Sequence, residues 1–161
     1  QNFKQGWYIE DVSYPNPQRP TGGHKSHQTG IDVDMSIPMN DGKMNISKRG
    51  KDASSTRWGF KNVNVADLDI EMNLLFLKYT APHASAVFLD RSLIAVLKNA
   101  AKIKSDAGTG GWNKDLFNVI FGPSRHGGFY ITHVSGHKNH YHVRLKPPGL
   151  NDNKAPFGKI D

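Results

Sequence analysis

Cysteine is absent from the 161 residues of this chain. Its absence excludes disulfide scaffolds, thiolate metal sites and cysteine nucleophiles. Any metal site must therefore take its ligands from histidine and carboxylate side chains, and packing alone must hold the fold together.

Long apolar runs are missing as well. Runs such as that of residues 74–77, which ends at Lys78, fall far short of the roughly 20 residues that span a bilayer, so we expect no membrane insertion. The chain opens with Gln1 and Asn2, without an initiator methionine or the apolar segment of a signal peptide. We therefore expect a processed form.

Acidic residues are too few to balance the basic ones. Lysine and arginine number 21 against 14 aspartates and glutamates, which gives a net charge of +7. This excess suits an anionic partner, such as nucleic acid, a membrane surface or a cell-wall polymer, and equally a solubilising surface. The basic residues are scattered and form no basic helix or RNA-binding motif, so we expect no nucleic-acid partner.

The spacing of apolar residues predicts an α+β fold. Alternation or short apolar runs predict strands over residues 6–9, 31–35, 86–89, 129–134 and 140–145, and helical spacing predicts helices over 67–79, 91–104 and 112–121. Asp90 is the expected N-cap of the second helix. We expect a single domain over residues 1–161, with 1–20 extended, 38–62 a long polar loop and 150–161 a loosely held tail.

Histidine is the unusual residue of this chain. Six of the eight histidines lie in two short stretches, His24 and His27 in one, and His133, His137, His140 and His142 in the other. Two clusters so far apart in the chain predict one site that is assembled by folding.

Strand geometry brings specific side chains together. Residues two apart in a strand face the same side, so Asp32 and Asp34 project together, as do His140 and His142. If the two strands are neighbours, Asp34 and His142 meet, and His27 in the preceding loop completes a three-ligand zinc site. Imidazole and carboxylate ligands suit zinc better than magnesium or calcium. The alternative is a purely structural histidine cluster, because an H-x-H pair alone is a weak pattern.

His137 and His140 are then left near the metal without a ligand role. One imidazole can accept a proton from water and pass it to a leaving amine, and the other can stabilise an oxyanion. His140 is favoured as the base because it shares a strand face with His142.

Other side chains have two interpretations each. Asp32 either orients a ligand imidazole or is a solvated strand residue. His133 faces either the site or the core, with the core favoured. Arg144 either forms a structural salt bridge, which is favoured, or holds a substrate carboxylate. Four aromatic residues are candidates for a substrate groove, with Trp112 assigned rather to the core: Trp58, Phe60, Trp112 and Tyr141.

Two stretches resemble the penicillin-insensitive murein endopeptidases of the MepA type, within the lysostaphin, D-Ala-D-Ala metallopeptidase and hedgehog group. They are residues 22–34, Gly-Gly-His-Lys-Ser-His-Gln-Thr-Gly-Ile-Asp-Val-Asp, and residues 137–145, which carry H-x-x-H-x-H followed by Val-Arg-Leu. The wider group shares only the H-x6-D and H-x-H skeleton, whereas Ser-His-Gln-Thr-Gly and the Asp-Val-Asp ending are more specific. The resemblance covers most of residues 20–148.

The resemblance implies the roles of the site residues. It makes His27, Asp34 and His142 the ligands of one zinc ion per chain, with His137 and His140 as catalytic residues. His24 becomes a further active-site residue. It also implies a small antiparallel sheet flanked by helices, with long loops around a zinc cleft.

The activity implied is that of a periplasmic or secreted peptidoglycan hydrolase, which cleaves D-Ala–meso-diaminopimelate cross-bridges by metal-activated water. The chain departs from the family in lacking cysteines and in carrying Val134 and Ser135 where aromatic residues are frequent. These departures leave open a D,D-carboxypeptidase, an L,D-endopeptidase, a non-catalytic zinc-containing binding module, and a phage lysin or secreted toxin built on the same domain. No oligomeric state follows from the residues.

Overall fold

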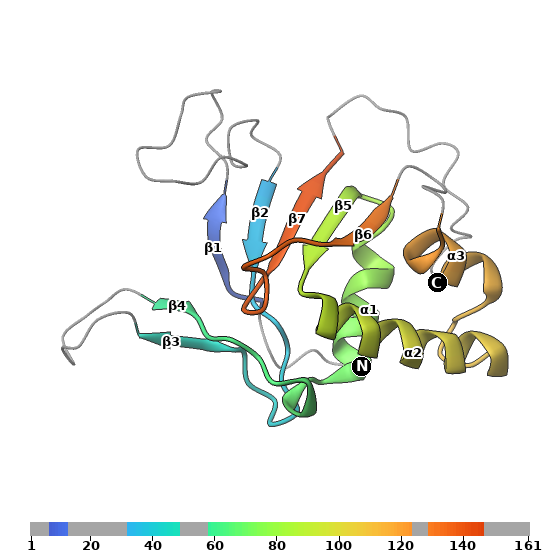
Figure 1. Ribbon diagram of the computed structural model, residues 1–161, viewed down its shortest axis with the longest axis horizontal. Coiled ribbons are helices and arrows are strands. Elements are labelled where there is room, and N and C mark those ends of the chain that lie inside the picture. Colours follow the sequence, from blue (N-terminus) through green and yellow to red (C-terminus); the bar gives the residue numbers. More distant parts are fainter. Residues whose placement is uncertain (1–6, 13–31, 49–57, 124–128, 147–161) are drawn as a thin grey trace.

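The computed structural model of the chain describes residues 7–12, 32–48, 58–123 and 129–146 (Figure 1). Within these residues the elements are β1 (Ile9–Val12), β2 (Asp32–Met35), β3 (Ile46–Lys48), β4 (Trp58–Phe60), the 3-10 turn η1 (Val65–Asp67), α1 (Ile70–Thr80), β5 (Ala84–Leu89), α2 (Arg91–Ala107), α3 (Lys114–Phe121), β6 (Tyr130–His133) and β7 (Tyr141–Leu145). The predicted α+β class is confirmed. No helix of the described residues is long and apolar enough to cross a membrane.

The main sheet has the strand order β1-β2-β7-β5-β6 (Figure 1). The pairs β1–β2, β2–β7 and β5–β7 are antiparallel, whereas β5 and β6 are parallel. The sheet is therefore mixed, whereas the resemblance had implied an antiparallel sheet. Its parallel pair is possible because α2 and α3 intervene between β5 and β6, and parallel strands need a crossover of at least about a dozen residues.

The helices cover one face of this sheet. Alternate strand residues such as Val33, Val87 and Val143 pack on that face against the apolar stripes of the helices. The helical side of the buried core comprises Leu74 and Leu77 from α1, Leu93, Leu97 and Ala101 from α2, and Leu116 and Ile120 from α3. The opposite sheet face is left for polar side chains.

The helix boundaries follow from capping chemistry. The Asp69 side chain accepts a hydrogen bond from the backbone N–H of Met72, so α1 begins at Ile70 and not at 67 as predicted. The intervening residues form η1. Asp90 caps α2 as predicted, accepting from the backbone N–H of Ser92. That helix runs on to Ala107, where Gly108 ends it in the left-handed region at φ +63°.

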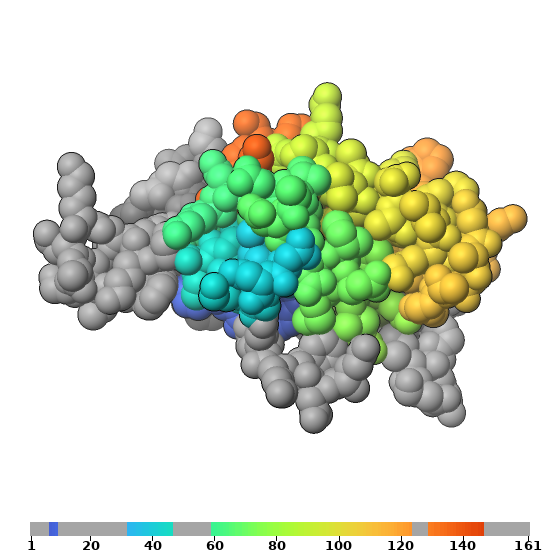
Figure 2. Space-filling view, turned by 90° about the horizontal axis from the view of Figure 1, so that it is seen from below, coloured from blue at the N-terminus to red at the C-terminus, as the bar shows by residue number. Residues whose placement is uncertain are grey.

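The segment expected as a polar loop, residues 38–62, contains secondary structure. Strands β3 and β4 pair antiparallel, and isolated bridges join Pro38 to Met44 and Met39 to Leu68. Its two strands are only three residues long each, too short for an alternation pattern to be readable. Figure 2, the view from below, shows three segments side by side: the segment that leads from β2 to β3 (cyan), then η1 with α1 (green), and then α2 (yellow). Residues 49–57 and 150–161 lie outside the described part of the chain.

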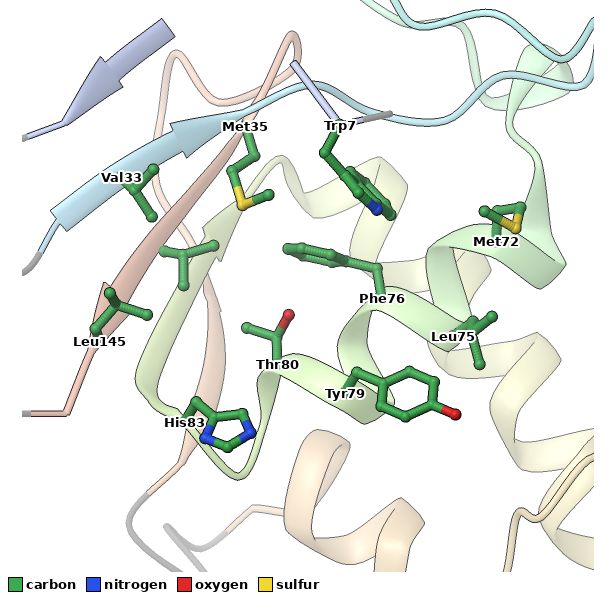
Figure 3. A pocket seen from close by; sticks show the side chains of 11 residues that line it. Trp7, Val33, Met35, Met72, Leu75, Phe76, Tyr79, Thr80, His83 and Leu145 are labelled. Atoms are coloured by element: carbon green, nitrogen blue, oxygen red, sulfur yellow. The ribbon is translucent and has the colours of Figure 1, made fainter. Parts of the chain in front are cut away.

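A cavity of about 430 Å³ lies between α1 and the helix-facing side of β2 and β7 (Figure 3). Its lining is mostly apolar and includes Trp7, Met35, Phe76 and Leu145. Because Met35 and Leu145 alternate with Asp34 and Arg144 along their strands, this cavity lies on the face opposite the predicted site. It is therefore not the expected zinc cleft.

Candidate metal centre and active site

The polar face of the sheet brings together the carboxylates of β2 and the basic side chains of β7. Asp34 is the register partner of His142, and Asp32 is the partner of Arg144. Because the pairing is antiparallel and in step, all four side chains project to the same side. The two stretches singled out in the sequence are thus neighbours in the sheet.

His142 lies between the two carboxylates. Its Nδ1 is 3.0 Å from Oδ1 of Asp34, and its Nε2 is 3.1 Å from Oδ1 of Asp32. Arg144 donates from Nε to the same Asp32 oxygen at 2.9 Å. Asp32, Asp34 and His142 are all buried. A buried aspartate that accepts from a histidine and an arginine fixes the orientation of the imidazole.

The pKa values of this group follow from burial opposed by hydrogen bonding. Burial alone would raise the pKa of Asp32, but hydrogen bonds from His142 and Arg144 outweigh it and lower that pKa below its usual range. Burial would lower the pKa of His142, but its hydrogen bonds to both carboxylates raise it to about 9. In the metal-free protein His142 is therefore an imidazolium at neutral pH, and a cation that binds here displaces a proton.

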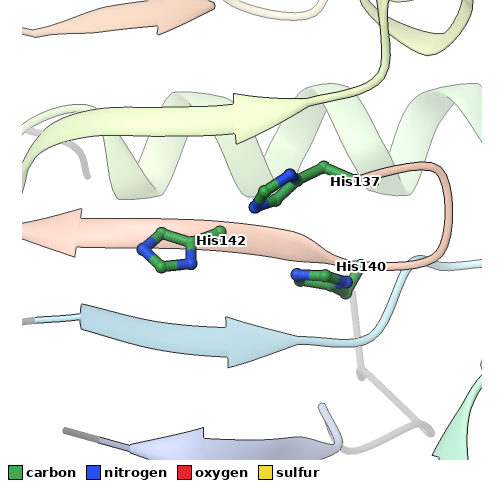
Figure 4. A group of neighbouring side chains, drawn as sticks. All are labelled: His137, His140 and His142. Atoms are coloured by element: carbon green, nitrogen blue, oxygen red, sulfur yellow. The ribbon is translucent and has the colours of Figure 1, made fainter. Parts of the chain in front are cut away.

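Two further imidazoles lie on the same side of the sheet. Three imidazoles offer ligand atoms that lie within 4.8 Å of one another: those of His137 in the turn before β7, His140 directly before the strand, and His142 within it. Figure 4 shows the three rings in front of the sheet, with α1 behind it. The ring centroid of His137 lies 4.7 Å from that of His140 and 5.6 Å from that of His142.

The contacts of His140 determine which nitrogen carries its proton. Its Nδ1 lies 2.6 Å from the side-chain oxygen of Asn139, which can only accept, so Nδ1 donates. The lone pair of the neutral ring is then on Nε2, which lies 3.6 Å from Oδ1 of Asp34. The ring of Phe60 stacks on His140 with centroids 5.5 Å apart and planes at 20°. His140 is thus oriented with its basic nitrogen toward the buried carboxylate.

His137 is held by backbone groups. Its Nδ1 donates to the carbonyl oxygen of Ser135 at 3.2 Å, and its own carbonyl accepts from the backbone N–H of Asp90 at 2.9 Å. Burial is the main reason that its pKa is lowered. The ring is therefore neutral at neutral pH, with the Nε2 lone pair available.

A buried asparagine fixes the turn that carries both imidazoles. The Asn45 amide donates to the backbone carbonyls of Lys61 and Asn139, and its oxygen accepts from the backbone N–H of Ile37 at 2.6 Å. The Val63 N–H also donates to the carbonyl of Lys138 at 3.0 Å. The segment around β3 and β4 therefore positions the turn that carries His137 and His140, and no sequence pattern indicated this role for Asn45.

The donor set suits a divalent metal of the zinc type. The buried Oδ1 of Asp34 lies 3.0 Å from Nδ1 of His142 and 3.6 Å from Nε2 of His140. On the other side of the His142 ring, the Asp32 carboxylate accepts from Nε2 and orients the imidazole. Nitrogen and oxygen donors in this combination are those of catalytic zinc sites. The residues present fit such an ion.

Several predicted site residues lie outside this cluster or outside the described residues. His24 and His27 fall in the undescribed range 13–31. His133 is exposed at the end of β6, where its Nδ1 accepts from the backbone N–H of Arg91, so the favoured core position is wrong. Trp112 is in the core as expected, and Tyr141 is fully buried and cannot line a groove.

Comparison with protein families gives a match over the N-terminal part of the chain. The family model described as penicillin-insensitive murein endopeptidase matches residues 1–91, which is more than half of the chain. The matched range contains the His24–Asp34 stretch and β2, whereas β7 and the second histidine stretch lie beyond it. No curated protein matches the chain.

Proposed function

The chain belongs to the penicillin-insensitive murein endopeptidase family, and on that premise we propose that it is a zinc-dependent enzyme that cleaves D-Ala–meso-diaminopimelate cross-bridges. Family membership itself makes the chain a peptidoglycan hydrolase and confirms the resemblance found in its sequence. The metal, the scissile bond and the roles of the individual residues are the proposal.

The observation that carries the proposal is the position of Asp34. Its buried Oδ1 lies 3.0 Å from Nδ1 of His142 and 3.6 Å from Nε2 of His140, on the polar face of the sheet. We assign one zinc ion to Asp34 and His142, with His27 as the third protein ligand from the stretch before β2. When bound, zinc lowers the pKa of a water molecule to about 7 and polarises the scissile carbonyl.

His140 acts as the general base in this proposal. Its Nδ1–H is bonded to Asn139, so Nε2 is the nitrogen that takes the proton of the attacking water and later gives it to the leaving amine. The ring of Phe60, which stacks on the imidazole, and the hydrogen bond from the Asn45 amide to the Asn139 carbonyl hold the imidazole in that orientation. Preorganisation of this kind removes the need to orient the base during the reaction.

His137 stabilises the oxyanion of the tetrahedral intermediate. Its Nδ1 is committed to the Ser135 carbonyl, so only Nε2 can face the substrate. The negative charge that develops on the carbonyl oxygen favours the protonated ring, which then donates from Nε2. His24 is assigned to the same active site from the family resemblance.

The substrate places the protein in the periplasm or outside the cell, where cross-linked peptidoglycan peptides lie. A net charge of +7 favours association with this anionic polymer. D,D-carboxypeptidase and L,D-endopeptidase activities would use the same centre, because the shape of the substrate site decides among them. A non-catalytic zinc-containing module would not need two imidazoles beside the ligands.

Digestion of purified sacculi tests the proposal. Protein loaded with zinc should convert cross-linked muropeptide dimers to monomers, and mass spectrometry of the products identifies the bond that is cut. A chelator should stop the reaction, and added zinc should restore it. Cleavage that is insensitive to the chelator, or no cleavage by the zinc-loaded protein, contradicts the mechanism.

Substitution of His140 separates the base from the ligands. His140→Ala should abolish turnover and leave the zinc content near one ion per chain. His83→Ala is the matched control, because His83 is exposed and borders the cavity on the opposite face of the sheet. Loss of zinc from His140→Ala would mean that His140 is a ligand.

A further inference from the structure

Arg144 has more donor groups than its structural contacts use. Its Nε donates to Asp32 at 2.9 Å, and its guanidinium lies 5.4 Å from the centroid of the Phe88 ring. Within the described part of the chain, no partner is recorded for its two terminal nitrogens. The side chain is 36% exposed. One edge of the guanidinium is therefore anchored on Asp32, and the terminal nitrogens of the other, open edge belong to a side chain that is partly exposed.

The position of that open edge is set by the sheet. Arg144 and His142 are two residues apart on β7 and face the same side, so their Cα atoms are about 7 Å apart. The Phe88 ring, on the neighbouring strand β5, lies 5.2 Å from the ring of His142 as well as beneath the guanidinium. The open edge therefore lies beside the centre that the proposed function assigns to the reaction.

We propose that Arg144 is a specificity-determining residue, which binds the substrate carboxylate borne by the carbon next to the scissile nitrogen. A guanidinium edge with two parallel N–H groups matches a carboxylate in a bidentate pair. In the cross-bridge of the proposed function, the D-centre of the diaminopimelate residue carries its carboxylate on that carbon. The inference rests on the proposed function, because the position of the scissile bond in the site determines which substrate carboxylate lies within reach of Arg144.

The anchored edge gives this binding its precision. Asp32 is buried and holds Nε, while the Phe88 ring supports the plane of the guanidinium. A side chain restrained in this way loses little conformational freedom when it binds a ligand. A lysine at this position would keep the charge but offer no planar pair of donors.

Two substrates distinguish this role from a purely structural one. One is a soluble muropeptide dimer with the free carboxylate, and the other is the same dimer with that carboxylate converted to a primary amide. The zinc-loaded wild-type protein should show a KM for the amidated dimer about 10-fold or more above that for the carboxylate dimer, since a hydrogen-bonded charge pair is lost. Its kcat should change less than its KM.

The variants should remove this discrimination. Arg144→Gln should raise KM for the carboxylate dimer about 10-fold or more beyond any change for the amidated dimer, because the loss of its bond to Asp32 acts on both substrates alike. Arg144→Lys should fall in between, and it serves as the second variant if Arg144→Gln does not fold. Lys102→Gln is the control, because Lys102 is an exposed cation on α2 that is likewise paired with a carboxylate, that of Asp106.

Each outcome has one meaning. An equal loss on both dimers, or a wild-type protein that does not distinguish them, overturns the role of Arg144 and leaves the proposed function standing. A wild-type protein that cleaves neither dimer overturns the proposed function, and the inference with it.

Discussion

Replacement of Asp32 by asparagine should weaken zinc binding although Asp32 is not a ligand. The side chain is fully buried, and its Oδ1 accepts from Nε2 of His142 at 3.1 Å and from Nε of Arg144 at 2.9 Å. Asparagine keeps the shape of the side chain but removes its charge. The free energy contributed by each hydrogen bond then falls by about 1–2 kcal/mol, from the range of charge-assisted bonds toward that of neutral ones. The imidazole is then less basic and less firmly oriented, and zinc affinity should fall about 10- to 100-fold.

The assay is a competition titration of zinc against a chromophoric chelator at pH 7, with thermal unfolding to verify the fold. Asp41→Asn is the matched control, because Asp41 is exposed and, among the residues that the structure describes, pairs with Lys43, 2.9 Å away. Its zinc affinity should equal that of the wild type. A folded Asp32→Asn protein that binds zinc within about threefold of the wild type would refute the orienting role of Asp32.

Three further predictions address pH, positioning and stability. The pKa of His142 is raised to about 9 in the folded protein, so the stabilisation from its imidazolium is fully present below the unfolded pKa of 6.5. Denaturant titration should therefore show that folding stability falls as the pH rises from 6.5 to 9, and His142→Gln should abolish this dependence. The lowered pKa of Asp32 gives the opposite sign, with stability lost only as the pH falls below about 3.8. Phe60→Leu removes the ring stacked on His140 and should lower kcat about 10-fold with zinc content unchanged, whereas an unchanged kcat would mean that the stacking does not position the base. Tyr141→Phe leaves the buried Oδ1 of Asn73 without its hydrogen bond at 2.6 Å and should cost about 1–3 kcal/mol of folding stability, while the exposed Tyr79→Phe should stay within about 0.5 kcal/mol of the wild type.

The strands that carry the site were predictable because their patterns are strict. Alternation in β2 fixed which face Asp32 and Asp34 share, and the H-x-H pair did the same at the start of β7. Their pairing, with Asp34 opposite His142, is the arrangement that the two stretches implied. Helix α2 was predictable for a similar local reason, since Asp90 caps its first turn.

The parts that escaped prediction depend on long-range contacts. Asn45 reaches Asn139 across 94 residues of sequence, and an isolated asparagine in a polar segment gives no indication of that contact. The parallel pairing of β5 and β6 depends on how α2 and α3 pack, which strand patterns do not encode. His133 was expected in the core, but its ring instead accepts a hydrogen bond at the start of α2.

The identity of the metal ligands is the central claim, and a crystal structure of the zinc-loaded protein with anomalous diffraction at the zinc edge tests it most directly. The proposal predicts one zinc ion bound to His27, Asp34 and His142 at about 2 Å, with His137 and His140 beside it but not coordinated. The described residues also offer the alternative set His137, His140 and His142, whose ligand atoms lie within 4.8 Å of one another. Zinc held by those three imidazoles, with Asp34 uncoordinated, would contradict the proposed centre.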